Sequence, residues 1–557
     1  MTAATAQHRV PRGVERYGVE PIPSELRTVG WRDLFAMMLA FNLSPLMYVL
    51  GAIVVVKGGL PLWWAAGTVA LGVGLAGVIL VVVAQAGVDY GLPGQVAMRA
   101  TFGQLAARAL TSPYRTVAAA YWFAAQALAG AFGLQAIVRG LVDYELPLVP
   151  VAVAFAAVQA VLAAIGFDLL RYFVRVMLPL MAVFTAALIA LFVSADDPAY
   201  AVSRVFDSPD QSLTWVGFAT FLTVLWGTQL TVVTNIADFC RYARSRAHMY
   251  VGILSGTIVG SFVASWVGAY AAVATGSLNP FVAVADLGGS AVLLAVLLVA
   301  VVLQTTAVNL MNIYSGGLSL VNAVPRLGRF WSTVVLGAIA VALSALPGVI
   351  EDAQEWMTHL GNVATPLAGV IIADYAILKR THIDVLALFD PKGRYRFLRG
   401  VNPAALVAVG IAVAVYYVLP HAWVKAAWGV GIGIVAYLAL ARLQAAIVPR
   451  TRAAIEPAEA DVEEVPAAQE VVLADAQIRP PDPAEEAVAA RAAPSATHRE
   501  SAVKAPASRG APASRTRRAW AAAVGAIVIG VSAYAGLTWV RRRQHASARG
   551  RRPEGSR

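Results

Sequence analysis

Apolar runs of about 20 residues follow one another along most of this 557-residue chain. A run of that length can cross a bilayer as one helix. The chain is 59% hydrophobic and 13% charged, whereas a soluble globular protein carries about 25% charged residues. We therefore predict an all-α membrane protein with twelve transmembrane helices. The expected spans are 33–56, 62–84, 116–138, 147–166, 176–194, 213–236, 249–275, 290–318, 332–350, 357–378, 402–420 and 424–447.

The positive charges indicate how these helices are oriented. Arginine and lysine gather in every second connection, for example at 99–115 and at 379–399. Cytoplasmic loops of membrane proteins carry such an excess, so we expect both ends of the twelve-helix core to face the cytoplasm, in a plasma or inner membrane. Because much of the net charge of +11 lies in these loops and in the tails, it does not indicate nucleic-acid binding. The one cysteine, Cys240, excludes an intrachain disulfide.

Composition divides the chain into five segments. Residues 1–32 are a polar cytoplasmic segment, and 33–447 are the twelve-helix core. Residues 450–515 are rich in Ala, Pro, Glu and Arg, which is typical of a disordered linker. Residues 519–540 are apolar and long enough for a thirteenth helix, although arginines on both sides leave its orientation open. Residues 541–557 are a basic tail.

A polar stripe interrupts the eighth apolar run after Leu303. On a helical wheel, the stripe occupies one arc of about 140° and consists of Gln304, Thr305, Asn309, Asn312 and Ser315. An unsatisfied amide in hydrocarbon is costly, so the stripe needs other helices, a water-filled cavity or a substrate as its partner. Because an amide offers donors and an acceptor without charge, the stripe suits a neutral ligand.

Two expected helices contain residues that interrupt a helix. The first contains Asn42-Leu43-Ser44-Pro45, followed by Gly51, and the sixth contains Trp226-Gly227-Thr228-Gln229. Pro and Gly free backbone groups near the middle of a membrane helix. Broken helices at corresponding places in two halves of a chain indicate the substrate and ion sites of transporters built from inverted repeats. A kink that serves packing alone is the alternative.

Several segments resemble signatures of one transporter family. They read GVEPIP at 18–23, GLPGQVAMRATFG at 91–103, NIADFCRY at 235–242, NLMNIYS at 309–315 and PLAGVIIADY at 366–375. In this order they resemble the nucleobase–cation symporter-1 family, the cytosine, purine, allantoin and hydantoin permeases, with helix eight most similar to the purine–cytosine branch. The resemblance covers about 15–447 and does not include the tail.

The resemblance implies a LeuT-like fold, with two inverted repeats of five helices and two further helices. The substrate of this family lies at mid-membrane, between the broken helices and helices three and eight. Trp122 and Gln126 match a W-x-x-x-Q motif and share one helix face, where an indole can stack on a ring and an amide can pair with its edge. Packing and an interhelical hydrogen bond are the alternative roles. The expected substrate-binding residues are Trp122, Gln126, Asn309, Asn312, Thr228, Gln229 and Asn42.

The chain departs from the family pattern in two places. On helix six, Gln229 stands where the family has an aromatic residue, and Trp226 lies nearly one turn away. On helix eight, sodium-coupled members have two adjacent hydroxyl residues, whereas alignment on Asn312 places Thr306 and Ala307 there. A shift by one residue would restore the pair Thr305–Thr306 as a cation site.

The resemblance to the purine–cytosine branch therefore favours protons over sodium as the coupling ion, with no further cofactor. We expect Asp238 and Asp374, which lie near helix ends, to cap helices or pair with Arg241 and Lys379 rather than to carry the proton.

These features predict a secondary transporter that imports a neutral nucleobase or related heterocycle. The alternatives are a transporter of an allantoin- or hydantoin-type compound or an amino acid, and a sensor that signals through residues 450–557. A site of tryptophan and amides suits an uncharged ring better than a zwitterion. An enzyme is not expected, because the seven histidines form no H-x-x-x-H or H-E-x-x-H motif.

Overall fold

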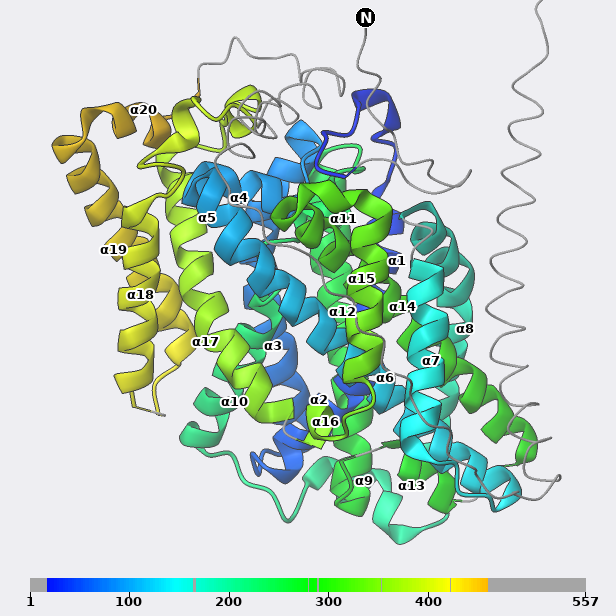
Figure 1. The fold of residues 1–557 in the computed structure, drawn as a ribbon. Helices are drawn as coiled ribbons and strands as arrows, with labels where there is room; N and C mark the ends of the chain where they lie inside the picture. Colours follow the sequence, from blue (N-terminus) through cyan, green and yellow to red (C-terminus); the bar gives the residue numbers. More distant parts are fainter. Residues whose placement is uncertain are drawn as a thin grey trace, which may run out of the picture.

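The computed structural model describes residues 18–458, apart from 164–166, Asn279, 288–289, Asp352 and His421. Every regular element in this part of the chain is a helix. Most helices run between two faces of one bundle (Figure 1). We call the end with α4, α11 and α20 the N-terminal face, because the chain enters there, and the end with α9, α13 and α16 the opposite face (Figure 1).

A helix lies in each of the twelve expected spans. The helices are α1 (Trp31–Asn42) with α2 (Pro45–Val56), α3 (Leu62–Tyr90), α6 (Ser112–Val142), α7 (Leu148–Ala163), α8 (Phe167–Val193), α10 (Trp215–Leu230), α12 (Arg246–Thr275), α14 (Ala291–Ala323), α15 (Gly328–Leu343), α17 (Ala353–Ile372), α18 (Pro403–Val418) and α19 (Lys425–Ile447). Seven described helical segments are long and apolar enough to cross a membrane, and the bent pair α1–α2 makes an eighth. The count of twelve crossings remains a prediction.

Several short helices were not expected from the apolar runs. They are α4 (Gly94–Phe102), α5 (Gln104–Ala106), α9 (Val202–Asp207), α11 (Ala237–Cys240), α13 (Pro280–Leu287), α16 (Gly348–Glu351) and α20 (Arg452–Ile455). Helix α20 packs at the N-terminal face, where Ala454 is buried and Arg394 donates a hydrogen bond to the Glu456 carbonyl at 2.9 Å. The expected start of the disordered linker at 450 therefore lies inside a folded segment. The possible helix at 519–540 lies outside the described residues.

Helix one is broken where the sequence predicts it. Helices α1 and α2 meet at an angle of 55°, with Leu43 and Ser44 between them and Pro45 in the first position of α2. Pro fits that position because it has no N–H to leave unpaired. In helix six the expected site was wrong, since α10 continues through 226–229 to Leu230 and the interruption follows at 231–236.

Packing explains why Gly227 does not end helix six. A Cβ atom added at Gly227 would lie 3.2 Å from the Cα atom of Gly361 in α17. The two glycines let the backbones of α10 and α17 approach closely, so Gly227 serves a helix contact and not a break.

Glycines on one face of α12 hold both halves of helix one. A Cβ atom added at Gly256 would lie 2.5 Å from the Phe35 carbonyl oxygen in α1, and one at Gly268 would lie 1.8 Å from the Tyr48 carbonyl oxygen in α2. No real Cβ fits at such distances. Because backbone touches backbone along both α1 and α2, these two helices and α12 form one tightly packed block.

A second block is built around α14, which packs along α6, α7, α8 and α15. Here the contact carries polar side chains. Asn309 of α14, for example, donates a hydrogen bond to Gln159 of α7 at 2.6 Å. Helix α14 also reaches α1, and α6 reaches α2, so the break in helix one lies where the two blocks meet.

Buried helix α4 connects helix six, α14 and helix ten at the N-terminal face. All nine of its residues are buried. Its Gln95 donates to Thr234 at 2.9 Å, and its Arg99 donates two hydrogen bonds to Asn322 of α14 at 2.6 and 2.9 Å. Thr101 donates to Asp374 at 2.8 Å. Helix α4 is thus fixed to the end of helix six, to α14 and to the end of helix ten at once.

Candidate functional site

Helix α6 brings Gln126 to the break in helix one, with Trp122 one helical turn before it. Both side chains are buried. The Nε2 atom of Gln126 donates to the hydroxyl of Ser44 at 3.2 Å, and its Oε1 atom has no hydrogen-bond partner among the described residues. The indole of Trp122 lies edge-on to Tyr121, with ring centroids 5.2 Å apart. An amide oxygen without a partner beside a tryptophan ring can accept a hydrogen bond from a bound ring.

Helix α14 places Asn309 and Asn312 beside the same part of α6. Asn309 Nδ2 donates to the backbone carbonyl of Phe123 at 3.2 Å and to Gln159 Oε1 at 2.6 Å. Asn312 Nδ2 donates to Asn309 Oδ1 at 3.4 Å. The two amides therefore form a chain anchored on helices three and four. Gln159 is a site residue that the sequence reading missed, because its lone polar side chain in an apolar run carries no signal of its partner.

Helix six contributes polar groups without protein partners near the end of α10. The hydroxyl of Thr228 and the indole Nε1 of Trp226 are buried and have no hydrogen-bond partner among the described residues. Gln229 is also buried. Within the described part of the chain, no hydrogen bond or ring contact joins these three residues to Trp122 or Asn312.

Asn42 is buried at the end of α1, and no hydrogen bond joins it to these residues within the described part of the chain. Its Nδ2 atom donates to the carbonyl of Met38, one turn earlier in α1, at 2.8 Å. A Cβ atom added at Gly260 of α12 would lie 2.8 Å from the Cβ of Asn42. The side chain thus begins against α12, inside the first block, and the structure does not bring it together with Trp122 or Asn312.

The two threonines expected at a cation site face helices three and four. Thr305 donates to the Val301 carbonyl at 2.8 Å, and a Cβ atom added at Gly130 of α6 would lie 2.7 Å from its hydroxyl. Thr306 donates to its own helix at 2.7 Å and accepts from Gln159 at 3.2 Å. Neither hydroxyl has a hydrogen bond to a described residue of helix one.

Gln304 is the polar side chain of α14 that does reach helix one. Its Nε2 atom donates to the Tyr48 hydroxyl at 2.8 Å, which lies 3.4 Å from the hydroxyl of Thr185. Its Oε1 atom has no partner among the described residues. The helical wheel includes Gln304 in the polar stripe, so the sequence carried this signal, although periodicity alone does not say which member of the stripe faces which helix.

The two aspartates near helix ends are buried in hydrogen-bond networks. Asp374 pairs with Lys379, as expected, and also accepts from Tyr437 at 2.7 Å. Asp238 accepts from the backbone N–H of Gly94 at 2.7 Å and from the hydroxyl of Ser315 at 2.8 Å. These bonds tie helix ends together at the N-terminal face.

The match to a family model identifies the kind of protein to which this site belongs. The model for permeases of cytosine/purines, uracil, thiamine and allantoin matches residues 21–440. That stretch contains all the expected site residues. The chain belongs to this permease family. Its expected membership of the nucleobase–cation symporter family is confirmed.

Two relatives of the permease are known by function. The hydantoin permease of Microbacterium maritypicum is 27% identical over 429 residues, which cover 71% of this chain and 82% of that protein. The purine-uracil permease NCS1 of Arabidopsis thaliana is 24% identical over 417 residues, which cover 70% and 69%. The alignments thus span most of each protein.

Solved structures share the fold of the permease. Mhp1, a nucleobase-cation-symport-1 family transporter in a closed conformation with bromovinylhydantoin bound, superposes with a TM-score of 0.69 at 22% identity, over 78% of this chain and 97% of that one. A Na+-coupled sialic acid symporter gives a TM-score of 0.54 at 11% identity, over 75% and 90%. The expected LeuT-like transporter fold is confirmed.

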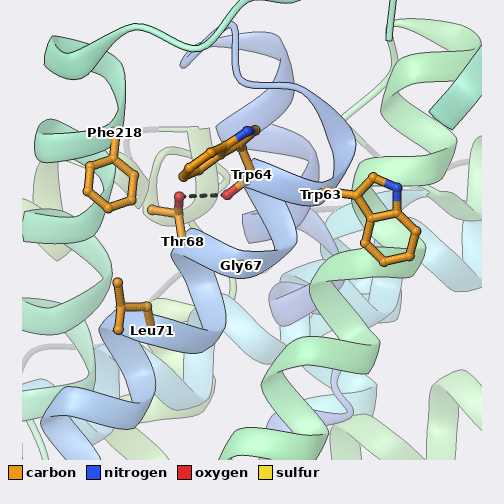
Figure 2. A pocket seen from close by; sticks show the side chains of 6 residues that line it. All are labelled: Trp63, Trp64, Gly67, Thr68, Leu71 and Phe218. Carbon is orange, nitrogen blue, oxygen red and sulfur yellow. Dashed lines mark hydrogen bonds between the residues drawn. The ribbon is translucent and has the colours of Figure 1, made fainter. Parts of the chain in front are cut away.

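A hollow at the outside of the permease is distinct from this site. It lies between the early part of α3 and α10, has a volume of about 370 Å³, and is lined by Trp63, Trp64, Gly67, Thr68, Leu71 and Phe218 (Figure 2). Its one side-chain hydroxyl, on Thr68, already donates to the Trp64 carbonyl at 2.6 Å (Figure 2). An apolar surface of this kind suits lipid chains better than a polar ring.

Proposed function

We propose that this permease imports a neutral nucleobase or related heterocycle by cation-coupled alternating access. The observation that carries this proposal is the uncharged middle of the bundle. From 118 to 138 in α6, and throughout α10 and α14, the chain has no Asp, Glu, Lys, Arg or His. These helices instead present Trp122 and several carboxamides. One of them, Gln126, has a side-chain oxygen with no hydrogen-bond partner in the described part of the chain. Such groups fit an uncharged planar ring.

Within this proposal Trp122, Gln126 and Asn312 contact the cargo, and Thr228 and Gln229 close the site from helix six. Trp122 supplies a flat ring for stacking, while the amides pair with the polar edge. The unpartnered hydroxyl of Thr228 supports its inclusion, because a buried polar group without a partner is costly unless a ligand satisfies it.

A second candidate cargo is a hydantoin- or allantoin-type cyclic ureide. The 27% identity to a hydantoin permease favours it. Such a ring is neutral and planar, like a nucleobase, and it carries N–H groups beside carbonyls. The same tryptophan and amides would hold it.

For the coupling ion we favour protons over sodium. Sodium coordination needs several oxygen ligands directed at one point. Thr305 lies against Gly130 of helix three and Thr306 is bonded to Gln159 of helix four, and neither hydroxyl has a hydrogen bond to a described residue of helix one. This arrangement supports the preference that the missing second hydroxyl, Ala307 in the Asn312-based alignment, suggested.

We further propose that the N-terminal face lies in the cytoplasm of a plasma or inner membrane. The described connections at that face contain basic residues in excess, including Arg244, Arg380 and Arg394. Positively charged loops are retained on the cytoplasmic side during insertion.

Radiolabelled uptake tests the proposal. Cells without their own permeases would express the chain and be offered cytosine, uracil, adenine, hypoxanthine, allantoin and hydantoin, with and without sodium and with a protonophore. We expect saturable uptake of at least one heterocycle, its loss with the protonophore and no dependence on sodium. Uptake of none of the six, with the protein present in the membrane, would contradict the proposed cargo class.

A further inference from the structure

The two asparagines of α14 differ in what can reach them. Asn309 has 0% of its surface exposed, whereas Asn312 keeps 3%, in the same range as the 5% of Gln126 and the 8% of Trp122. Asn309 is therefore enclosed by protein on every side. Of the two asparagines, Asn312 is thus the one with surface left for a cargo.

Hydrogen bonds fix the carboxamide of Asn309 in one orientation. Its Nδ2 donates at 3.2 Å to the backbone carbonyl of Phe123, which can only accept. The same nitrogen donates to Gln159 Oε1 at 2.6 Å. Gln159 is itself oriented, because its Nε2 donates to Thr306 Oγ1 at 3.2 Å and the proton of that hydroxyl is directed at the Val302 carbonyl, 2.7 Å away. Two backbone carbonyls thus determine which end of each amide is nitrogen.

The orientation passes on to Asn312. Both N–H groups of Asn309 are used, so only its Oδ1 faces Asn312, whose Nδ2 donates to it at 3.4 Å. An acceptor on Asn309 requires a donor from Asn312. Among the described residues Asn312 has no further hydrogen bond, so its Oδ1 and one N–H remain for another partner, with their order along α14 fixed.

We propose that Asn309 is a positioning residue that touches no cargo, and that through Asn312 it selects rings whose edge carries an N–H beside a carbonyl. The ring N–H donates to Asn312 Oδ1, and the ring carbonyl accepts the remaining N–H of Asn312. This is the edge of a cyclic amide, as in a pyrimidinedione or a cyclic ureide. A ring methylated on that nitrogen leaves the amide oxygen unpaired and is rejected. The inference rests on the proposed function.

Uptake of hydantoin and of its ring N-methyl derivatives tests this assignment in the full-length permease. The variants are Asn312→Ala, Asn309→Ala and Gln159→Leu, the last of which disturbs the relay one step further from the cargo. Ser319→Ala is the matched control, because this α14 hydroxyl bonds only to its own helix at Ser315. Detergent-extracted yield and thermal unfolding report on the fold of each variant.

We expect Asn312→Ala to abolish saturable uptake. Asn309→Ala and Gln159→Leu should each raise the KM for hydantoin about tenfold, the effect of about 1.4 kcal/mol, and reduce the preference for hydantoin over its disfavoured N-methyl derivative by a similar factor. A merely structural role would lower folded protein and leave that preference unchanged.

Unchanged preference in both folded relay variants, or normal uptake by Asn312→Ala, would overturn the assignment. If the unmodified permease takes up neither hydantoin nor any other heterocycle, the failure belongs to the proposed function instead.

Discussion

Helices α12 and α14 each hold their neighbours at the middle of the membrane, but by opposite means. Helix α12 presents glycines such as Gly256 and Gly268 to α1 and α2, so backbone lies on backbone. Helix α14 presents amides to α6 and α7, and its Asn309 is bonded to both. In a bilayer, close van der Waals contact and interhelical hydrogen bonds are the two available ways to hold helices together.

The difference assigns separate tasks to the two contacts. Glycine contacts have no polar groups to leave unpaired, and they fix α1 and α2 on α12 as one body. Amide contacts have directional groups, so they can also present a defined donor and acceptor to a ligand. The close glycine contacts lie in one block, and we propose that recognition lies in the other, with the break in helix one between them.

We expect the largest effect from a substitution that breaks the glycine contact between α2 and α12. Gly268→Leu would put a side chain where even a Cβ atom lies 1.8 Å from the Tyr48 carbonyl oxygen. Because a backbone atom cannot move aside alone, we expect little folded protein, judged by the yield and monodispersity after extraction. Gly410→Leu is the control, since a Cβ atom there meets nothing within 4 Å. Equal yields for the two variants would refute a tight α2–α12 contact.

We expect a smaller effect when glycine is replaced by alanine once in each block, and the two replacements can be compared directly. Gly256→Ala in α12 meets the Phe35 backbone at 2.5 Å, whereas Gly130→Ala in α6 meets side chains, the Thr305 hydroxyl at 2.7 Å and the Phe155 ring at 2.8 Å. We expect Gly256→Ala to destabilise by about 2 kcal/mol or more and Gly130→Ala by about 1 kcal/mol, within the usual range for overpacking. Thermal unfolding in detergent measures both. The reverse order would show that the polar block is the more rigid one.

Gln126→Leu tests the junction between the blocks. Among the described residues, the side chain of Gln126 bonds to Ser44 alone, a bond that joins the blocks, and its oxygen has no partner, so the free energy of unfolding should change by less than about 1 kcal/mol. Uptake should nevertheless fall at least about tenfold, because the cargo loses an acceptor. Gln135→Leu, near the end of the same helix, provides a matched glutamine control. Normal uptake by Gln126→Leu removes this residue from the site.

The smallest effect is expected from Thr305→Val. This threonine faces Gly130 and donates only to its own helix, so the loss of its hydroxyl should change stability by less than about 0.5 kcal/mol. Uptake and its response to sodium should both stay as in the unmodified permease. A strong loss of uptake that high sodium restores would instead place a sodium ion at Thr305.

The features that could be predicted from the sequence are those that a few neighbouring residues determine. The expected break at 42–45 is present because Pro45 and Ser44 determine it within one turn. The break in helix six was misplaced by a few residues, because Gly227 is used for a contact with Gly361 that no local pattern reveals. Helix α4 was missed because its nine residues are too short and too polar for a span.

The site was predicted only as far as a helical wheel allows. The wheel placed Asn309 and Asn312 on one face, and they are adjacent. It could not separate their roles, since these depend on Gln159 of another helix. It also grouped Thr305 with Gln304, although one faces α6 and the other reaches Tyr48. Which neighbouring helix each polar side chain of α14 contacts depends on residues that are distant in sequence.

Helix α4 has a consequence for the speed of the permease. Its hydrogen bonds reach Thr234 of helix six and Asn322 of α14, so any opening that separates these two elements at the N-terminal face, as the proposed alternating access would, has to break them. Each bond that opening breaks before water replaces it adds to the activation barrier, and about 1.4 kcal/mol of barrier slows a step tenfold. Under the proposed alternating access, release of this buried nine-residue helix by its neighbours would contribute to the barrier whatever the cargo.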